Sequence, residues 1–312
     1  MNILIGSNVN WWNAEAAYAA VTARLLKEEG HRVFVLTRPG SDNEKKLRLM
    51  GLEVMVEPDL NTQNPFKLLN SYFQLKEFLK KEKIEIVNPH RSEGFPLYAL
   101  ARKSLPSFRL IRTRGASRKV RPHWSNRVLH RDWTDAIIVP GKIVAERDLA
   151  GIPISRDSLH VIHYPIDLPV IPPAEALNEY RTEFSIPENH KILAVVGRIR
   201  QEKGHLILAE SFQQLLQDFP LTTLLILYRD TPDELPEMLQ LQNHLKELGI
   251  MEQVRFDAER EDIRSLMAFA DGGVVSSIDS EVICRDAVEC FSSGTPVAAM
   301  PTGCLHEIIL EG

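Results

Sequence analysis

The sequence predicts an α/β protein made of two doubly wound domains, each a parallel sheet covered by helices on both faces. Its 312 residues are enough for two domains of ~100 to 200 residues each. Both halves alternate short β-branched runs with amphipathic stretches, which is the pattern of strands and crossover helices. Between them, residues 164–174 contain four prolines, which disfavour both helix and central strand.

In the first half the apolar runs are continuous, which favours strands buried on both faces of a parallel sheet. One helix is expected over residues 14–29, with Asn13 as its N-cap and Gly30 just beyond its C-terminus, and another over 65–81. Strands are expected at 3–5, 33–37, 54–56, 84–87, 110–112, 137–139 and 160–163. These elements form a first domain of residues 1–168.

A proline-rich linker is expected at 169–175, and a second domain at 176–312. Its strands are expected at 192–196, 222–227, 254–256 and 273–275. Its helices are expected at 205–217, 236–248, 263–270 and 287–292. No sequence repeat relates the halves, so we expect two similar architectures rather than a solenoid.

Composition places the chain among ordinary globular proteins, with 44% hydrophobic and 25% charged residues. No apolar run approaches ~18 residues, and the N-terminus lacks a basic region followed by a long apolar stretch. Three cysteines, Cys284, Cys290 and Cys304, show no Cys-x-x-Cys spacing and are expected to be buried reduced thiols. We therefore expect a cytoplasmic protein.

The mild net charge of -5 hides a difference between the halves. Residues 1–170 contain 26 basic and 18 acidic side chains, whereas the remainder contains 11 basic and 24 acidic ones. Two halves of opposite sign are expected to bind different partners.

The loop after the strand at 192–196 combines glycines with cations. Arg198 offers a planar fork of donors, and Lys203 offers a mobile ammonium. Gly197 permits a tight turn, and Gly204 admits a helix N-terminus with unpaired N–H groups. Because ligands of open parallel sheets bind beyond the carboxyl ends of the strands, this loop is a candidate diphosphate site. A solvated basic turn has the same composition.

Glu281 and Glu289 form a second candidate group. With a helix beginning after Glu281, a rise of ~1.5 Å per residue separates the carboxylates by roughly 10 Å. That distance suits the two ends of an extended ligand and is too long for a shared proton. A capping acid followed by an exposed helix acid gives the same spacing.

Taken together, these residues resemble the family 4 glycosyltransferases of the GT-B fold. The second domain of that family carries Gly-Arg-x4-Lys-Gly, Glu-x7-Glu, Ser-Gly-x-Pro-Val and Gly-x3-Glu in this order. Here they correspond to residues 197–204, 281–289, 293–297 and 303–307. The resemblance covers nearly the whole chain and implies two Rossmann-like domains facing a cleft.

The resemblance also implies an activity. A sugar moves from a nucleoside-diphosphate sugar to a glycan or lipid-linked acceptor, with retention of configuration, as in lipopolysaccharide or polysaccharide synthesis. Arg198 and Lys203 are implied at the donor diphosphate, Glu289 at the nucleotide ribose and Glu281 at the donor sugar, with Gly197 beside them. Arg198, Lys203 and Glu281 are the implied catalytic residues.

No cofactor is implied, because the nucleotide sugar is the substrate. The chain contains no Asp-x-Asp, so we expect no metal, with the side-chain cations in its place.

In the first domain the resemblance implies Gly6 as a donor-binding residue. Many relatives place a histidine after the strand that corresponds to 110–112, and this chain does not. His90, which follows the strand at 84–87, is the nearest candidate for a catalytic histidine in the cleft. A surface loop residue is the alternative for His90.

The segment 109–131 is strongly basic. It contains no acid, and its cations are Arg109, Arg112, Arg114, Arg118, Lys119, Arg121, Arg127 and Arg131. With His123 and Trp124 it mixes aromatic and cationic character, as a lipid-headgroup or phosphorylated-glycan site does. We expect an anionic acceptor or peripheral membrane contact here, at the inner face of the membrane, through Arg112, Arg114, Arg118, Lys119 and Arg121. A solvated basic face is the alternative, and nucleic acid is not expected.

Two other functions stay open. The family usually follows its first glutamate with Gly-Phe-Gly, whereas this chain has Val282-Ile283-Cys284, which leaves donor identity open and admits a non-catalytic nucleotide-sugar-binding protein. A nucleotide-sugar epimerase of the same fold is the other. A dinucleotide oxidoreductase is disfavoured by the lack of Gly-x-Gly-x-x-Gly after either first strand. Because relatives continue beyond the motif at 303–307, we expect the second domain to be incomplete at its C-terminus.

Overall fold

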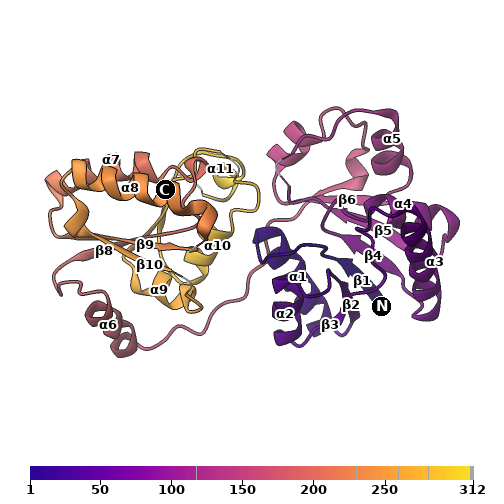
Figure 1. Ribbon diagram of the computed structural model, residues 1–312, viewed down its shortest axis with the longest axis horizontal. Helices are drawn as coiled ribbons and strands as arrows, with labels where there is room; N and C mark the ends of the chain where they lie inside the picture. The colour runs from indigo at the N-terminus through magenta and orange to yellow at the C-terminus, as the bar shows by residue number, and fades with distance from the viewer. Residues whose placement is uncertain (117, 230, 259, 280, 310–312) are drawn as a thin grey trace. The chain divides into compact units, whose positions relative to one another are not determined.

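The computed structural model describes residues 1–116, 118–229, 231–258, 260–279 and 281–309. It divides into two compact units, Met1–Pro165 and Ile166–Gly312, each built around its own parallel sheet (Figure 1). Residues 310–312 lie outside the described residues, and the expected C-terminal incompleteness of the second domain stays a prediction. The fold class predicted from sequence, two doubly wound α/β units, is confirmed.

The first unit has a seven-stranded parallel sheet in the order β3-β2-β1-β4-β5-β6-β7. Its strands are β1 (Asn2–Gly6), β2 (Arg32–Leu36), β3 (Glu53–Met55), β4 (Ile86–Pro89), β5 (Arg109–Thr113), β6 (Ala136–Val139) and β7 (Leu159–Val161). Its α-helices are α1 (Ala14–Glu28), α2 (Asp42–Leu49), α3 (Pro65–Lys81), α4 (Phe95–Ser104) and α5 (Trp124–Arg127). Short π-helical turns follow at 128–132 and 144–148, and a 3-10 turn at 156–158.

The ends of α1 are those expected from sequence. The side chain of Asn13 accepts a hydrogen bond from the backbone N–H of Ala16 at 2.9 Å. Gly30, just past the helix, has φ of 82°, a left-handed conformation that a residue with a Cβ adopts only at a cost. Both predicted caps are confirmed.

Two strands differ from the expectation of full burial. The segment predicted at 54–56 forms β3, which is partly exposed, and the segment predicted at 160–163 forms β7, in which two of three residues are exposed. Both strands lie at the edges of the sheet and have one neighbour each. The expectation was wrong here because an edge strand is not enclosed by the sheet on both sides.

Alternation along β1 shows how the sheet is covered on both faces. Ile3 and Ile5 point into a cluster with Ala19 and Val35, whereas Leu4 points into a separate cluster with Leu75. Successive strand side chains point to opposite faces, so the two clusters are the two layers of core that a doubly wound fold requires.

The second unit has a five-stranded parallel sheet in the order β10-β9-β8-β11-β12. Its strands are β8 (Lys191–Val196), β9 (Thr222–Tyr228), β10 (Val254–Ala258), β11 (Gly272–Val275) and β12 (Val297–Ala299). Its helices are α6 (Ala174–Glu183), α7 (His205–Asp218), α8 (Leu235–Glu247), α9 (Ile263–Phe269), α10 (Arg285–Ser292) and α11 (Leu305–Ile308). Figure 1 shows α7 and α8 on one face of this sheet and α9 on the other.

Two boundaries in this unit differ from expectation. The helix α6 begins at Ala174, inside the segment predicted as linker. The helix α10 begins at Arg285 rather than directly after Glu281, because Cys284 has φ of 55° and interrupts helical geometry.

The cysteines follow the prediction, since Cys284, Cys290 and Cys304 are all buried and free of disulfides. Among the described residues, no helix has the length and apolar content needed to cross a bilayer.

Candidate functional site

The candidate site of the second unit lies where the chain reverses direction across its sheet. Strand β8 is the first strand of the sheet and lies between β9 and β11, so its carboxyl end is the topological switch point. Residues 197–204 follow β8, and residues 276–279 and Glu281 follow β11. Parallel strands place these two loops at the same edge, where ligands of open α/β sheets bind.

Lys203 is the centre of this site. Its ammonium lies 2.5 Å from Glu281 Oε1 and 3.8 Å from Asp286 Oδ2. Burial by itself would lower the pKa of Lys203, but Asp286 and Glu281 outweigh that effect and raise it. The lysine is therefore a fixed positive charge, and the predicted partners Lys203 and Glu281 are brought together.

The backbone around Lys203 is equally constrained. Ser276 donates its hydroxyl to the Lys203 carbonyl at 2.7 Å. Gly204 has φ of +68°, and an added Cβ would come 2.1 Å from the carbonyl oxygen of Ser276. Only glycine permits this approach between the loops after β8 and β11.

Glu281 is buried, and hydrogen bonds fix both its side chain and its backbone carbonyl. The hydroxyl of Ser277 donates to its Oε1 at 2.6 Å. Its own carbonyl accepts the backbone N–H of Cys304 at 2.6 Å, and a Cβ on Gly303, whose φ is +58°, would come 1.9 Å from that oxygen. The motif at 303–307 thus contributes to the site by fixing the backbone of Glu281.

Glu289 lies on α10 and is also buried. Arg285, one helical turn earlier, donates from Nε to Glu289 Oε1 at 2.7 Å. A buried carboxylate with one charged donor keeps lone pairs available for a ligand. Sequence reasoning named Glu289 and missed Arg285, although a spacing of four residues on a helix was the signal for this pair.

Asp286 is a further site residue that sequence reasoning missed. The pKa of Asp286 is raised to about 6, mainly by burial; the Lys203 charge opposes this rise, and the neighbouring Glu281 and Glu289 add to it. Three carboxylates, Glu281, Asp286 and Glu289, thus share one small region with two cations, and Asp286 takes up a proton near pH 6. Nothing in the linear spacing distinguished it, because its pKa depends on the surrounding side chains.

The two arginines of this loop, Arg198 and Arg200, differ in exposure and in the carboxylates that they approach. Arg198 is 54% exposed, and its guanidinium lies 3.7 Å from the Glu202 carboxylate. Arg200 instead points to the buried Glu234 at 3.6 Å. Arg198 can therefore swing toward an anion, whereas Arg200 contributes to the structure of the loop.

His205 is the first residue of α7 and is buried, with neither ring nitrogen hydrogen-bonded among the described residues. Burial and the Lys203 charge lower its pKa to about 4. It is neutral at physiological pH and lies at a helix N-terminus, where backbone N–H groups favour an anion.

In the first unit, β1 and β4 form the corresponding switch point. Gly6, at the end of β1, accepts the backbone N–H of His90 at 2.8 Å, and an added Cβ would lie 2.9 Å from the buried hydroxyl of Tyr98. His90 is buried, its Nε2 lies 3.0 Å from Asn88 Oδ1, and burial and the Arg112 charge lower its pKa to about 3. His90 is therefore a neutral interior residue rather than a surface loop residue, and its catalytic role stays a prediction.

The basic segment 109–131 is divided by the fold. Arg112 is 1% exposed, donates to the Pro89 carbonyl at 2.7 Å and lies 5.1 Å from the Phe95 ring. Arg114 is 5% exposed and donates to the Arg118 carbonyl. Arg112 lies in strand β5 and Arg114 directly follows it, and both side chains are buried in the interior. The expectation that these two residues contact a membrane surface was therefore wrong, whereas a contact with an anionic acceptor stays a prediction. Arg118, Lys119 and Arg121 are exposed, as predicted.

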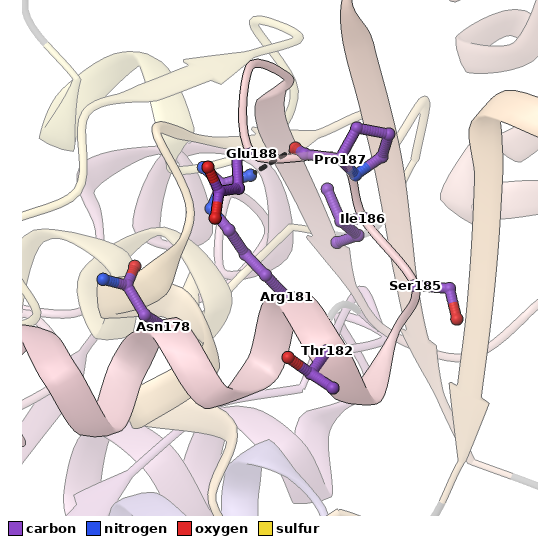
Figure 2. A pocket seen from close by; sticks show the side chains of 7 residues that line it. All are labelled: Asn178, Arg181, Thr182, Ser185, Ile186, Pro187 and Glu188. Atoms are coloured by element: carbon purple, nitrogen blue, oxygen red, sulfur yellow. Dashed lines mark hydrogen bonds between the residues drawn. The ribbon is translucent and has the colours of Figure 1, made fainter.

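A shallow pocket lies elsewhere in the second unit, over the turn between α6 and β8. Figure 2 shows Arg181 reaching from α6 to the Pro187 carbonyl, which it meets at 2.8 Å. The pocket is lined by Asn178, Arg181, Thr182, Ser185, Ile186, Pro187 and Glu188, and contains none of the predicted site residues. Within the described ranges, no three His, Cys, Asp or Glu side chains gather as a metal site.

Family models match both units. Residues 16–169 match Glycosyltransferase Family 4, and residues 178–312 match Glycosyl transferases group 1. A D-inositol 3-phosphate glycosyltransferase of Mycolicibacterium smegmatis is 31% identical over 183 residues, which cover 58% of this chain and 41% of that protein. A lipopolysaccharide 1,2-N-acetylglucosaminetransferase of Salmonella typhimurium is 26% identical over 136 residues, covering 42% of this chain and 36% of that protein. The chain thus spans about two fifths of the length of the curated relatives it matches.

Solved structures show the same fold. Anabaena HepE in complex with UDP and glucose superposes with a TM-score of 0.82 at 18% identity, covering 100% of this chain and 84% of that one. A glycosyltransferase from Rickettsia africae gives 0.84 at 20% identity, covering 99% and 82%. A UDP-GlcNAc 2-epimerase from Neisseria meningitidis gives 0.60 at 17% identity, covering 95% and 81%. These likenesses establish the GT-B fold.

Proposed function

This chain belongs to the GT-B glycosyltransferases that join a family 4 domain to a group 1 domain, and from that premise we propose that it transfers a sugar from a nucleoside-diphosphate sugar to a glycan or lipid-linked acceptor. The observation that carries the proposal is the cluster of Lys203, Glu281 and Asp286 at the switch point of the second sheet. It combines a fixed cation with buried acceptors for sugar hydroxyls.

The donor is proposed to bind with its diphosphate at Lys203 and Arg198. Lys203 is held in place, and Arg198 is exposed and able to close over a phosphate. Glu281 then faces the sugar and Glu289 the ribose, with Gly197 beside the diphosphate. Gly6 of the first unit stays a predicted donor-binding residue. The UDP and UDP-glucose bound in Anabaena HepE support a nucleotide-sugar donor by analogy of fold.

We propose that transfer retains the anomeric configuration. The acceptor hydroxyl attacks the anomeric carbon on the face that the phosphate leaves. The carbon–oxygen bond to the diphosphate breaks, the new glycosidic bond forms, and the hydroxyl proton passes to the departing phosphate oxygen. Lys203 and Arg198 stabilise the negative charge that grows on the diphosphate. His90, the remaining catalytic candidate, is proposed to contribute as a neutral hydrogen-bonding group.

A metal ion is not required in this proposal. Glu281 and Asp286 are the carboxylates beside the proposed diphosphate position, and the Lys203 ammonium lies within 4 Å of both. It therefore already pairs with both carboxylates that a divalent ion would use.

The acceptor is proposed to be anionic and to meet the first unit through its exposed cations Arg118, Lys119 and Arg121. Arg112 and Arg114 are left out of this contact because they are buried. The cytoplasm, or the inner face of a membrane, is the proposed place of action.

The test is sugar transfer from radiolabelled UDP-glucose and other nucleotide sugars, with and without a chelator, followed by NMR of the anomeric proton in the product. Transfer that survives chelation with retained configuration is expected. Loss of activity on chelation that manganese restores would overturn the metal-free proposal, and an inverted product would overturn retention. Conversion of the donor to an epimer without acceptor would show an epimerase instead, and donor binding without turnover would show a binding protein.

A further inference from the structure

The loop between β1 and α1 presents an exposed tryptophan. Trp11 is 57% exposed. The next residue, Trp12, is only partly exposed, because it packs against the core cluster that contains Ile3 and Val35, and the Lys46 ammonium lies 5.5 Å from its ring centroid. Trp12 therefore serves the fold, whereas the indole of Trp11 is open to a ligand.

The same loop holds Trp11 in a fixed place. Near its start, the carbonyl of Ser7 accepts the hydroxyl of Thr37 at 2.8 Å. Directly before Trp11, the carbonyl of Asn10 accepts the backbone N–H of Asp42 at 2.9 Å. The capped N-terminus of α1 follows two residues after Trp11. An aromatic side chain on a fixed backbone binds a ligand at a lower entropic cost than one on a mobile loop.

An ion-paired cluster lies at the same edge of the sheet. Strand β4 pairs with β1, with Pro89 opposite Gly6, so the loops that follow the two strands begin side by side. From the second loop, Arg91 donates through Nε and Nη2 to both carboxylate oxygens of Glu93, at 3.2 and 3.0 Å. Its Nη1 donates to Glu15, in the first turn of α1. All three side chains are partly exposed, and the carboxylates keep lone pairs that can accept hydrogen bonds from a ligand.

We propose that this edge of the first sheet binds a short stretch of the acceptor glycan, with one pyranose ring stacked on Trp11 and sugar hydroxyls hydrogen-bonded to Glu15, Arg91 and Glu93. A pyranose face presents C–H groups, which the negative face of an indole attracts, and its rim presents hydroxyls. Trp11 precedes Glu15 by four residues, so their Cα atoms lie at most roughly 14 Å apart, within the span of a disaccharide or trisaccharide. Only the assignment of this glycan as the acceptor rests on the proposed function.

Charge decides between a sugar and a nucleotide, which also stacks on an indole. The cluster offers two carboxylates, and its one guanidinium is already paired with both. It therefore disfavours a nucleoside phosphate, which needs a cation, and suits the neutral hydroxyls of a sugar. The anionic group proposed for the acceptor is assigned instead to Arg118 and Arg121, in the loop after β5.

The test is saturation-transfer NMR of the whole chain with lactose, maltose and cellobiose, and affinities come from the concentration dependence of the signal. Binding of at least one disaccharide is expected, with the strongest transfer to the protons on one face of a ring. Trp11→Ala is expected to weaken that affinity by roughly fivefold to tenfold, because the stacking contact is lost, and Trp11→Phe to restore part of it. Glu93→Ala is expected to weaken it severalfold while the affinity for UDP-glucose stays unchanged.

The matched control is Trp124→Ala, which removes a 79% exposed indole from the same unit and is expected to bind as wild type. Circular dichroism of each variant checks that the fold persists. The saccharide site would be overturned if none of the three disaccharides binds, if Trp11→Ala binds as wild type, or if Trp124→Ala loses as much affinity.

Transfer kinetics separate this inference from the proposed function. With a bound disaccharide as acceptor, Trp11→Ala is expected to raise the acceptor KM and to leave the donor KM unchanged; an unchanged acceptor KM would overturn the acceptor assignment. Disaccharide binding that depends on Trp11, in a chain that transfers no sugar, would keep the saccharide site and overturn only the transferase proposal.

Discussion

The ammonium of Lys203 lies 2.5 Å from a carboxylate oxygen of Glu281, and the two residues come from loops that follow different, adjacent strands. The residue assigned to the donor diphosphate is therefore held by the residue assigned to the donor sugar. In the proposed binding mode, a donor would share this ion pair, so its phosphate and its sugar would be recognised as one unit.

Replacing Lys203 by alanine is expected to lower turnover more than donor affinity. The lysine charge matters most when negative charge develops on the leaving phosphate, and loss of one such donor typically costs about 10² to 10³ in kcat. The measurement is kcat and donor Kd from transfer and calorimetry. Lys191→Ala is the matched control, because Lys191 lies at the opposite end of β8 and pairs with Asp271 at 2.8 Å. Unchanged kinetics in Lys203→Ala would overturn the assigned site.

Donor affinity is expected to rise as pH falls from about 7.5 to about 5. Asp286 has a pKa of about 6, so it becomes neutral over this range and stops repelling a diphosphate. A nucleotide sugar has no group of its own that titrates there. Calorimetry with UDP-glucose is expected to show a gain on the order of threefold to tenfold in wild type. In Asp286→Asn the affinity at pH 7.5 is expected to be high already and independent of pH; a pH dependence equal to that of wild type would contradict this assignment.

Gly303→Ala is expected to impair both stability and donor binding. The new methyl group would meet the Glu281 carbonyl at 1.9 Å in a residue with φ of +58°. The left-handed conformation alone costs roughly 1 to 2 kcal/mol of unfolding free energy, and the contact adds to it by moving Glu281. Gly249→Ala is the control, since Gly249 has φ of +70° with nothing within 4 Å of its added Cβ, and only the conformational cost is expected there. Urea unfolding and donor titration separate the two effects, and equal losses in both variants would contradict the role of Gly303.

Acid is expected to destabilise the first unit partly through His90. Burial and the Arg112 charge lower its pKa to about 3, whereas an unfolded histidine takes up a proton near pH 6.5. The unfolded state therefore gains protons first, and unfolding free energy falls as pH drops from 6.5 toward 3, by up to roughly 3 to 5 kcal/mol. His90→Gln is expected to flatten this dependence in urea unfolding at a series of pH values, and the exposed His123→Gln is expected to leave it unchanged. An acid limb that is the same in His90→Gln and wild type would contradict the assignment.

The sequence by itself determined the fold and the main motif residues of this protein. Strand–helix alternation, the caps Asn13 and Gly30 and the glycine-lysine loop at 197–204 are encoded in short stretches, because backbone conformation and hydrophobic periodicity are local properties. The parallel-sheet topology that this alternation predicts also places Lys203 and Glu281 at one edge of one sheet, since the carboxyl ends of parallel strands share that edge.

Only the tertiary structure decided burial and charge balance. Arg112 and Arg121 look alike in a basic run, but one is carried into the core by β5 and the other stays exposed. The pKa of Asp286 is raised by its burial beside Glu281 and Glu289. Phe66 is exposed because the face of α3 that packs against the core is the opposite one, which carries Leu75. Each of these properties depends on neighbours supplied by other segments of the chain, and a side chain's solvation and field are set by those neighbours rather than by the residues next to it in sequence.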